Sequence, residues 1–402
     1  MNILFLSPAW PPEMPNYVRR LRDVGATVWG VGDTPKAALP PGARAGLSAY
    51  LQVPSMLGDD ALLDRIAAWL PQRPDRVEAL WEPVMGPAAE LRARWGLPGL
   101  GPDAVAGFRD KPLMKARIEA AGLPTPPSVR ARTRADVWAA AERVGFPLIL
   151  KPVAGAGSAD THRVASPEAL RQVLPRLAHV EEVAVEAFVQ APEYTYETLS
   201  IDGRPVLRSV CRYWPNTLEA RQQEWISPII HTYRSPPPDT LPGVELGDAV
   251  LGALGMGTGI SHMEWFLAPE GPQFGEVAAR PPGANMVDLM NYAGDIDLFL
   301  EWARAIVHGR CELPTARPWS AAIVFKRAQG QGRIRRIEGL RRFVEAHRPY
   351  VARVDLLPIG APRRDWRATF LSDGNLVVRH PDDDTCLALA REAAATIRMV
   401  AG

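Results

Sequence analysis

The sequence 261-SHMEWFLAPEGPQFGEVAARPPGAN-285 decides how the rest of the chain is interpreted. It predicts two strands, residues 262–267 and 273–278, joined by a turn over 268–272 that is rich in Pro and Gly. Such a hairpin places Glu264 and Glu276 side by side on one face, where two carboxylates repel each other unless a cation lies between them. The alternative is a hairpin whose glutamates are solvated on its outer face.

The chemistry of this hairpin suits a hard metal ion. Mg²⁺ usually takes one or two carboxylates and leaves nucleotide phosphates and water to complete its shell. Arg280, in the loop 280–283 that follows, would direct a fixed positive charge at the same spot. A helix is expected to begin near Asn285. Residues elsewhere in the chain are needed to distinguish a metal site from a solvated face.

The composition is ordinary for a globular enzyme. The chain has 402 residues, which predicts two or three domains, and it is 47% apolar and 23% charged. A net charge of +1 gives no reason to expect a nucleic acid or an anionic membrane as partner. The three cysteines are far apart and form neither a disulfide framework nor a metal motif, so we expect a reducing, cytoplasmic location. No apolar run approaches the roughly 18 residues of a membrane helix, and the apolar N-terminus predicts a strand rather than a signal peptide.

The first hundred residues predict an open parallel α/β sheet. The expected strands and helices alternate: strands 2–6, 27–31 and 76–81, and helices 16–24, 59–70 and 86–95. No G-x-G-x-x-G sequence lies between a strand and a helix, so a dinucleotide site has little support. Ligands of such sheets bind at the carboxyl ends of strands, which makes Glu82 a candidate substrate contact.

A lysine and a run of small residues follow in the middle of the chain. A helix is predicted over 108–122 with Asp110 as its cap, another over 134–144, and a buried strand over 146–152. Lys151 ends that strand, and the small-residue loop 153–160 comes directly after it. The loop's N–H groups and the lysine suit phosphate oxygens, although a flexible hairpin turn accounts for them equally well.

Later strands carry further acids. Glu186 interrupts the apolar strand 183–189, and a buried acid needs a partner. The remaining predicted elements are a hairpin over 193–201 and 204–213, a strand over 225–233, helices over 243–254, 287–292 and 296–307, short strands over 321–326, 350–357, 367–371 and 375–379, and a helix within 384–399.

Taken in order, these residues resemble the ATP-grasp superfamily of ATP-dependent ligases, over roughly residues 1–380. The resemblance implies an α/β and α+β ATP-grasp fold in four parts. Its expected parts are an N-terminal open α/β (pre-ATP-grasp) domain at 1–107, ATP-grasp subdomains at 108–190 and 191–313, and a small C-terminal β-rich subdomain at 314–402.

The resemblance also implies a nucleotide site. Two lysines contact the phosphates, a flexible loop closes over them, a hinge strand holds the adenine and one acid holds the ribose. In that order the implied residues are Lys111 and Lys151, then Gly155, Gly157 and Ser158, then Glu186, Phe188 and Val189, and finally Glu193.

The same resemblance implies the metal and substrate contacts. Glu264 and Glu276 look like the metal carboxylates, and Arg280 like the arginine beside the acyl phosphate. Many members carry an Asn two residues after the second Glu, where this chain has Ala278, so water or Asn285 would have to complete the shell. The candidate substrate contacts are Glu82, Gly283 and Asn285.

The stretches RDK…AAGLPTP, HMEWF and GEVAARPPG most resemble the L-amino-acid ligase group. That implies a carboxylate–amine ligase that forms an amide or peptide bond through an acyl phosphate and releases ADP and phosphate. The implied cofactors are ATP and Mg²⁺, with Mn²⁺ as an alternative. The expected partners are a small carboxylic acid and an amine, with no nucleic acid and no membrane, and a homodimer is the default assembly. A bicarbonate-using carboxylase-like enzyme and a catalytically silent ATP-binding scaffold stay open as alternatives, the latter because of Ala278.

Overall fold

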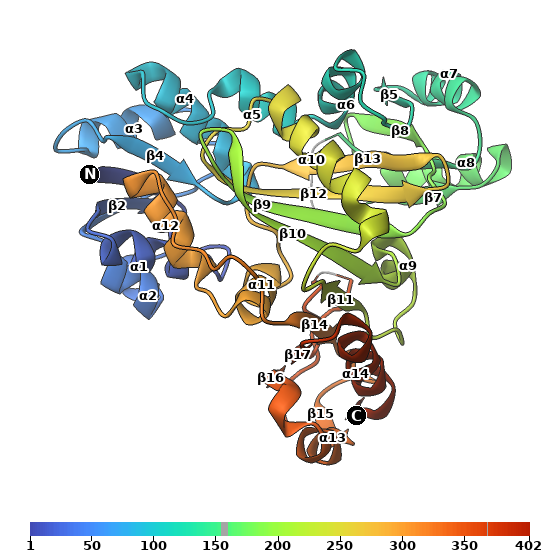
Figure 1. Cartoon of the computed structure of the whole chain (residues 1–402). Helices are drawn as coiled ribbons and strands as arrows, with labels where there is room; N and C mark the ends of the chain where they lie inside the picture. Colours follow the sequence, from blue (N-terminus) through green and yellow to red (C-terminus); the bar gives the residue numbers. More distant parts are fainter. Residues whose placement is uncertain (154–159, 368) are drawn as a thin grey trace.

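The computed structural model describes residues 1–153, 160–367 and 369–402. The predicted loop residues Gly155, Gly157 and Ser158 lie outside these ranges. No helix in the described ranges combines the length and the apolar character that crossing a bilayer requires. The chain has the ATP-grasp fold, in which an N-terminal parallel sheet is followed by antiparallel sheets that carry helices (Figure 1).

The N-terminal part is an open parallel sheet with the strand order β3-β2-β1-β4. Its elements are β1 (Asn2–Leu6), α1 (Met14–Asp23), β2 (Thr27–Gly32), α2 (Pro41–Gly46), β3 (Ala49–Gln52), α3 (Leu62–Trp69), β4 (Arg76–Ala79) and α4 (Met85–Trp95). The predicted βαβ start is confirmed, because β1 is a run of apolar residues that is buried almost throughout.

Two short helices replace the predicted helix 108–122. They are α5 (Pro102–Arg109) and α6 (Lys111–Ala120), and Phe108 belongs to the first of them. Pro112 lacks an N–H and is tolerated only in the first turn, so a helix cannot run through it. Asp110 caps α6 as predicted, since its side chain accepts a hydrogen bond from Leu113 N at 2.9 Å.

A small four-stranded antiparallel sheet with the order β5-β8-β6-β7 comes next. Its elements are β5 (Ser128–Ala131), α7 (Arg134–Val144), β6 (Leu148–Pro152), β7 (His162–Val164), α8 (Pro167–Val173) and β8 (Val183–Ala187). The chain enters and leaves it through segments held to the large sheet. Phe274 N donates to Pro124 O at 2.9 Å, and Leu267 N donates to Pro192 O at 3.0 Å.

The large sheet has eight strands in the order β13-β12-β9-β10-β11-β14-β17-β16. The elements of its first part are β9 (Glu193–Ile201), β10 (Arg204–Trp214), α9 (Thr217–Gln222), β11 (Ile229–Thr232), α10 (Leu241–Ala253), β12 (Gly259–Ala268), β13 (Gly271–Ala278), α11 (Met286–Gly294) and α12 (Leu298–His308). Its β12–β13 turn is shorter than predicted. Ala268 pairs with Gly271, whose φ of 122° lets the chain re-enter the sheet at once.

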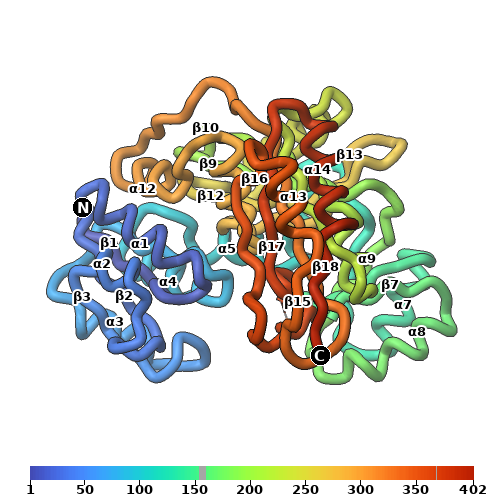
Figure 2. Tube along the Cα trace, turned by 90° about the horizontal axis from the view of Figure 1, so that it is seen from below, coloured from blue at the N-terminus to red at the C-terminus, as the bar shows by residue number. Residues whose placement is uncertain are grey.

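The C-terminal strands mostly extend this sheet. The elements are β14 (Ser320–Phe325), β15 (Ile334–Glu338), α13 (Leu340–Ala346), β16 (Val351–Leu356), β17 (Gly374–His380), α14 (Asp383–Thr396) and β18 (Arg398–Ala401). β14 pairs with β11, and only β15 and β18 form a separate two-stranded sheet. The prediction of a strand over 367–371 is wrong, because the described residues of this range lie in turns near Ser372, which has a positive φ. Figure 2 shows these strands crossing the middle of the molecule seen from below.

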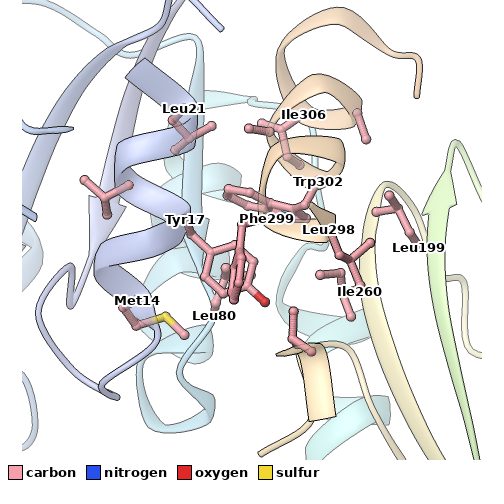
Figure 3. Close-up of a cluster of buried hydrophobic side chains, with 14 of the residues drawn as sticks. Met14, Tyr17, Leu21, Leu80, Leu199, Ile260, Leu298, Phe299, Trp302 and Ile306 are labelled. Atoms are coloured by element: carbon pink, nitrogen blue, oxygen red, sulfur yellow. The ribbon is translucent and has the colours of Figure 1, made fainter. Parts of the chain in front are cut away.

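Helix α12 returns to the N-terminal part and packs on α1. Tyr17 lies against Phe299 and Trp302, with ring centroids 4.8 and 5.1 Å apart and edge-to-face geometry (Figure 3). Trp302 is fully buried, and Ile260 is 1% exposed. This apolar cluster fixes the N-terminal sheet against the large sheet, as burial of such aromatic side chains stabilises an interface by several kcal/mol (about 1.5–3 each).

Candidate active site

A cavity of about 920 Å³ lies between the small sheet and the large sheet. The structure gathers most of the predicted site residues around it. Lining members of that set are Lys111, Lys151, Glu186, Phe188, Val189, Glu193, Glu264, Glu276, Arg280 and Gly283. Glu82 and Asn285 do not line it.

The hairpin faces this cavity because its other face is covered. Met263 and Trp265 point to the opposite side and are fully buried. Helix α10 approaches so closely there that a Cβ added to Gly243 would lie 2.2 Å from the Trp265 ring. Glu264 and Glu276 are paired in register on the cavity side. A solvated outer face therefore does not describe these two glutamates.

Lysines of α6 and β6, together with Glu186 of β8, form the polar centre of the cavity. Lys151 Nζ lies 2.9 Å from Glu186 Oε2, and Lys115 Nζ lies 3.7 Å from the same oxygen. Burial alone would raise the pKa of Glu186, but the charges of Lys115 and Lys151 outweigh it and lower that pKa. The buried acid of β8 thus has the partners that its apolar surroundings require.

Lys115 was missed by the sequence analysis. It is 4% exposed and lies one helical turn after Lys111, so both point from α6 into the cavity. Burial lowers the pKa of Lys115 to about 8, more than Glu186 raises it. The i,i+4 spacing of the two lysines is the sequence signal that could have identified it.

Glu276 is held by cations in this arrangement. Its two carboxylate oxygens lie 3.3 Å from Lys111 Nζ and 3.7 Å from Lys151 Nζ. Burial opposes the charge of Lys151, yet the carboxylates of Glu186 and Glu276 raise its pKa. A polyphosphate entering the cavity would meet lysines that are already oriented and charged.

Glu264 has a different neighbour, His262, on the same strand. His262 Nε2 lies 3.7 Å from Glu264 Oε1, and its Nδ1 lies 2.9 Å from Glu197 Oε1. Burial works against the imidazolium, but the two glutamates raise the pKa of His262 to about 9. Burial likewise opposes the charge of Glu264, whose pKa His262 and the lysines lower.

The donor set of the hairpin fits a divalent cation that phosphates and water help to hold. Glu264 and Glu276 offer carboxylate oxygens from paired positions. Thr195, opposite Glu264 on β9, has a buried hydroxyl oxygen with no hydrogen-bond partner. In the ranges that the structure describes, no three Asp, Glu, His or Cys side chains are already gathered as a metal cluster, since Glu276 turns toward the lysines.

Glu193 lines the cavity but is tied to helix α9. Its carboxylate accepts hydrogen bonds from Thr217 N and Thr217 Oγ1, both at 2.9 Å. Burial and then the charge of Glu264 raise the pKa of Glu193 to about 7, although the Thr217 hydrogen bonds lower it. A ribose hydroxyl would have to join or replace Thr217 at this carboxylate.

The predicted adenine contacts lie where β8 ends. Phe188 and Val189 line the cavity with Ile149 of β6, and together they give it an apolar wall. The guanidinium of Arg163 lies 4.4 Å from the centre of the Phe188 ring. A flat aromatic base suits such a slot.

Arg280 lines the cavity and is fixed by Glu82. Arg280 Nε lies 2.9 Å from Glu82 Oε2, and Nη1 donates to Pro281 O at 2.9 Å. Glu82 thus reaches the site through Arg280. Asn285 begins α11 with a φ of 57°, and its role as a substrate or metal contact stays a prediction.

Part of the cavity wall is apolar. Its lining residues come from β10, β11, α11 and the segment before β17, and they are Tyr213, Ile230, Met286 and Phe370. Phe370 packs edge-to-face on Phe325 of β14, with centroids 5.0 Å apart. Sequence analysis missed Phe370, because only the folded chain brings it to the cavity.

This chain is similar to several known proteins. The model for the ATP-binding domain of the carbamoyl-phosphate synthase L chain matches residues 110–199. The L-arginine-specific L-amino acid ligase of Bacillus subtilis is 24% identical over 217 residues, or 52% of each chain. The chain spans about half the length of the curated relatives it matches, 52% in each of two cases.

Solved structures resemble the whole chain. An L-amino acid ligase from Bacillus licheniformis has a TM-score of 0.79 at 20% identity, with 100% of this chain and 98% of that chain covered. The N5-carboxyaminoimidazole ribonucleotide synthetase of Thermotoga maritima has a TM-score of 0.72 at 17% identity, with 100% and 99% covered. At these identities the likeness shows the fold. The fold and the family model that matches residues 110–199 lead to one conclusion: this chain has the ATP-grasp fold, with an ATP-binding domain in its middle.

Proposed function

We propose that this protein is an ATP-dependent carboxylate–amine ligase that forms an amide or peptide bond through an acyl phosphate. The observation that carries the proposal is that Lys111, Lys151, Glu264, Glu276 and Arg280 all line the same cavity. The lysines suit the polyphosphate, the glutamates a metal ion, and the arginine an acceptor carboxylate.

Phosphoryl transfer to a carboxylate depends on placement and charge neutralisation more than on a special base. Lys111 and Lys151 would hold the phosphate charge of ATP at one end of the reacting pair. Arg280, oriented by Glu82 at 2.9 Å, would hold the carboxylate at the other. A divalent ion at Glu264 and Glu276 would supply Lewis-acid stabilisation of the phosphate oxygens.

The second half of the reaction is attack by an amine on the acyl phosphate. Arg280 would stabilise the oxyanion of the tetrahedral adduct before phosphate leaves. The walls of the cavity would keep water from the acyl phosphate, which water would otherwise hydrolyse. The products are an amide, ADP and phosphate.

The test is phosphate release with ATP and Mg²⁺ or Mn²⁺ against a panel of amino acids and other carboxylic acids, each with and without an amine pool. The proposal expects release that needs both an acid and an amine, with the amide product seen by mass spectrometry. Glu276→Gln is the matched control and should abolish release. Turnover with bicarbonate alone would instead indicate a carboxylase-like enzyme, and tight ATP binding with no turnover would indicate a silent scaffold.

A further inference from the structure

The imidazole of His262 is a cavity-lining group that the proposed reaction does not use. Its Nδ1 lies 2.9 Å from an oxygen of Glu197, which is fully buried on β9 directly opposite. The second oxygen of Glu197 accepts from Cys211 Sγ at 3.3 Å. Glu197 is therefore held from both sides and cannot turn toward the cavity.

A buried carboxylate on Nδ1 has a defined effect on the other ring nitrogen. It keeps a proton on Nδ1, so a cation that binds the ring displaces the proton of Nε2 to solvent, and the lone pair freed there points away from Glu197. In metalloproteins a ligating histidine characteristically donates its second N–H to a carboxylate in this way, which orients the ring and raises its basicity. Here Nε2 points toward Glu264 Oε1, 3.7 Å away.

The neighbouring positions leave room for an ion beside this nitrogen. On β13, Ala278 lies directly opposite His262, and Glu276 directly opposite Glu264. Ala278 supplies no donor atom and little bulk. The hairpin therefore carries two carboxylates and one imidazole at neighbouring positions, with Ala278 leaving space beside His262.

We propose that His262 Nε2 is a third protein ligand of the divalent cation that Glu264 and Glu276 hold. This inference rests on the metal role in the proposed function and goes beyond it, because it gives the site a nitrogen donor. Imidazole suits transition ions, whereas Mg²⁺ prefers an all-oxygen shell. The site should therefore take Mn²⁺ in preference to Mg²⁺ more strongly than two carboxylates alone would.

The movements required are small. Neighbouring ligands on one octahedral ion with bonds of about 2.1 Å lie about 3 Å apart, so His262 and Glu264 need to approach by less than about 1 Å. Glu276 has to turn from Lys111 and Lys151 toward the ion, and its side chain is 29% exposed and borders the cavity. Lys151 keeps Glu186 as its partner at 2.9 Å.

The experiment is pulsed EPR of Mn²⁺ bound to the full chain with ADP, using protein in which histidine alone carries ¹⁵N. Coupling of Mn²⁺ to ¹⁵N is expected in the wild-type protein and absent in His262→Asn. The label separates histidine from the nitrogens of lysine and adenine. Bound Mn²⁺ without any ¹⁵N coupling in the wild type would overturn the inference, and it would favour an imidazolium that only pairs with Glu197 and Glu264.

Affinities give a second measurement. His262→Asn should lower the ratio of Mn²⁺ to Mg²⁺ affinity about 10-fold, and Glu197→Gln, which keeps the imidazole, should weaken Mn²⁺ binding about 10- to 100-fold. His179→Asn, at an exposed histidine far along the chain from the hairpin, is the control and should change neither. An unchanged ratio in a folded His262→Asn would contradict the inference.

The failures of the two proposals are distinguishable. A chain that binds no Mn²⁺–ADP at all contradicts both the metal role and the nitrogen ligand. A chain that forms amides with Mn²⁺ bound through oxygen alone keeps the proposed function and loses only His262 as a ligand. Should His262→Asn not fold, the ¹⁵N spectrum of the wild type still decides.

Discussion

Two sets of cavity-lining residues are built in different ways. We call Lys111, Lys115, Lys151 and Glu186 the nucleotide half, and Arg280, Tyr213, Met286 and Phe370 the acceptor half. The nucleotide half is a set of buried ion pairs on neighbouring elements. The acceptor half is one ion pair, Arg280–Glu82, in an apolar wall.

This difference indicates which half suits a common ligand and which half suits a particular substrate. Buried charges that face each other need accurate geometry, because an unpaired partner is costly. An apolar wall needs no such pairing of charges, and substitutions can change its shape at a modest cost in stability. Under the proposed function, the nucleotide half would suit one fixed ligand, ATP, and the acceptor half would suit the acid substrate. Four substitutions test this contrast.

The largest effect is expected from Lys151→Met in the nucleotide half. ADP formation should fall about 1,000-fold, since a cation at the transferred phosphate is lost. Removing one partner of a buried pair should also lower the free energy of unfolding by about 3–5 kcal/mol, measured by urea titration. Lys36→Met on the surface is the control. A Lys151→Met protein as stable as the wild type would break the contrast between the halves.

Arg280→Lys should affect only the acceptor half. Lys keeps the charge but loses the planar fork, so acid-dependent ADP formation should fall about 100-fold. The dissociation constant for ATP, measured by calorimetry, should stay within about twofold of the wild type, because Arg280 lies outside the nucleotide half. Glu82→Gln, which keeps the guanidinium, should cost less. Equal losses of ATP affinity and turnover would contradict the separation.

Glu193→Gln tests a buried carboxylate of the cavity that belongs to neither half, through the pH dependence of the free energy of unfolding. The folded pKa of about 7 lies above the ordinary glutamate pKa of 4.5, so the folded state binds the proton more tightly. Glu193 therefore contributes stability that is full below pH 4.5 and is lost as the pH rises to about 7, by up to about 3 kcal/mol. The variant should lack this part of the decline in unfolding free energy. An identical pH profile in both proteins would show that Glu193 ionises normally.

The smallest effect is expected from Phe370→Ala in the apolar wall. Loss of part of the wall should raise the KM for the acid about 3- to 10-fold, which corresponds to about 1 kcal/mol. ATP affinity should not change. The measurement is steady-state kinetics at saturating ATP, with Tyr292→Phe, outside the cavity lining, as the control. A larger effect than that of Arg280→Lys would mean that shape rather than charge holds the acid.

The sequence predicted the parts of the site that are local along the chain. Lys151 ends an apolar strand, and Glu264 and Glu276 share one hairpin, so strand alternation alone brings them together. Glu197 and His262 are 65 residues apart, and only the pairing of β9 with β12 makes them neighbours. Such a pair leaves no local pattern to detect.

The sequence analysis missed Phe370 and misassigned the C-terminal strands for a related reason. The stretch 367–371 has strand-like residues, but turns around Ser372 are tied to Arg327 and Asp373 by side-chain contacts that no local propensity reports. That β14 pairs with β11 rather than forming its own sheet is likewise decided by tertiary contacts. In the N-terminal sheet, β1 and β2 were predictable because they are mostly buried apolar runs, whereas β3, whose four residues are exposed or half-buried, was not predicted.

The small sheet is joined to the rest of the chain by two crossings. Both crossings are pinned to the hairpin, at Pro124 by Phe274 and at Pro192 by Leu267. Lys151 of the small sheet lies 3.7 Å from Glu276 of the hairpin, so this ion pair spans the two sheets, whereas the pairs of β12 with β13 lie within the large sheet. Because salt weakens ion pairs, we expect a higher ionic strength to loosen the small sheet from the hairpin and to leave Glu264 and Glu276 side by side.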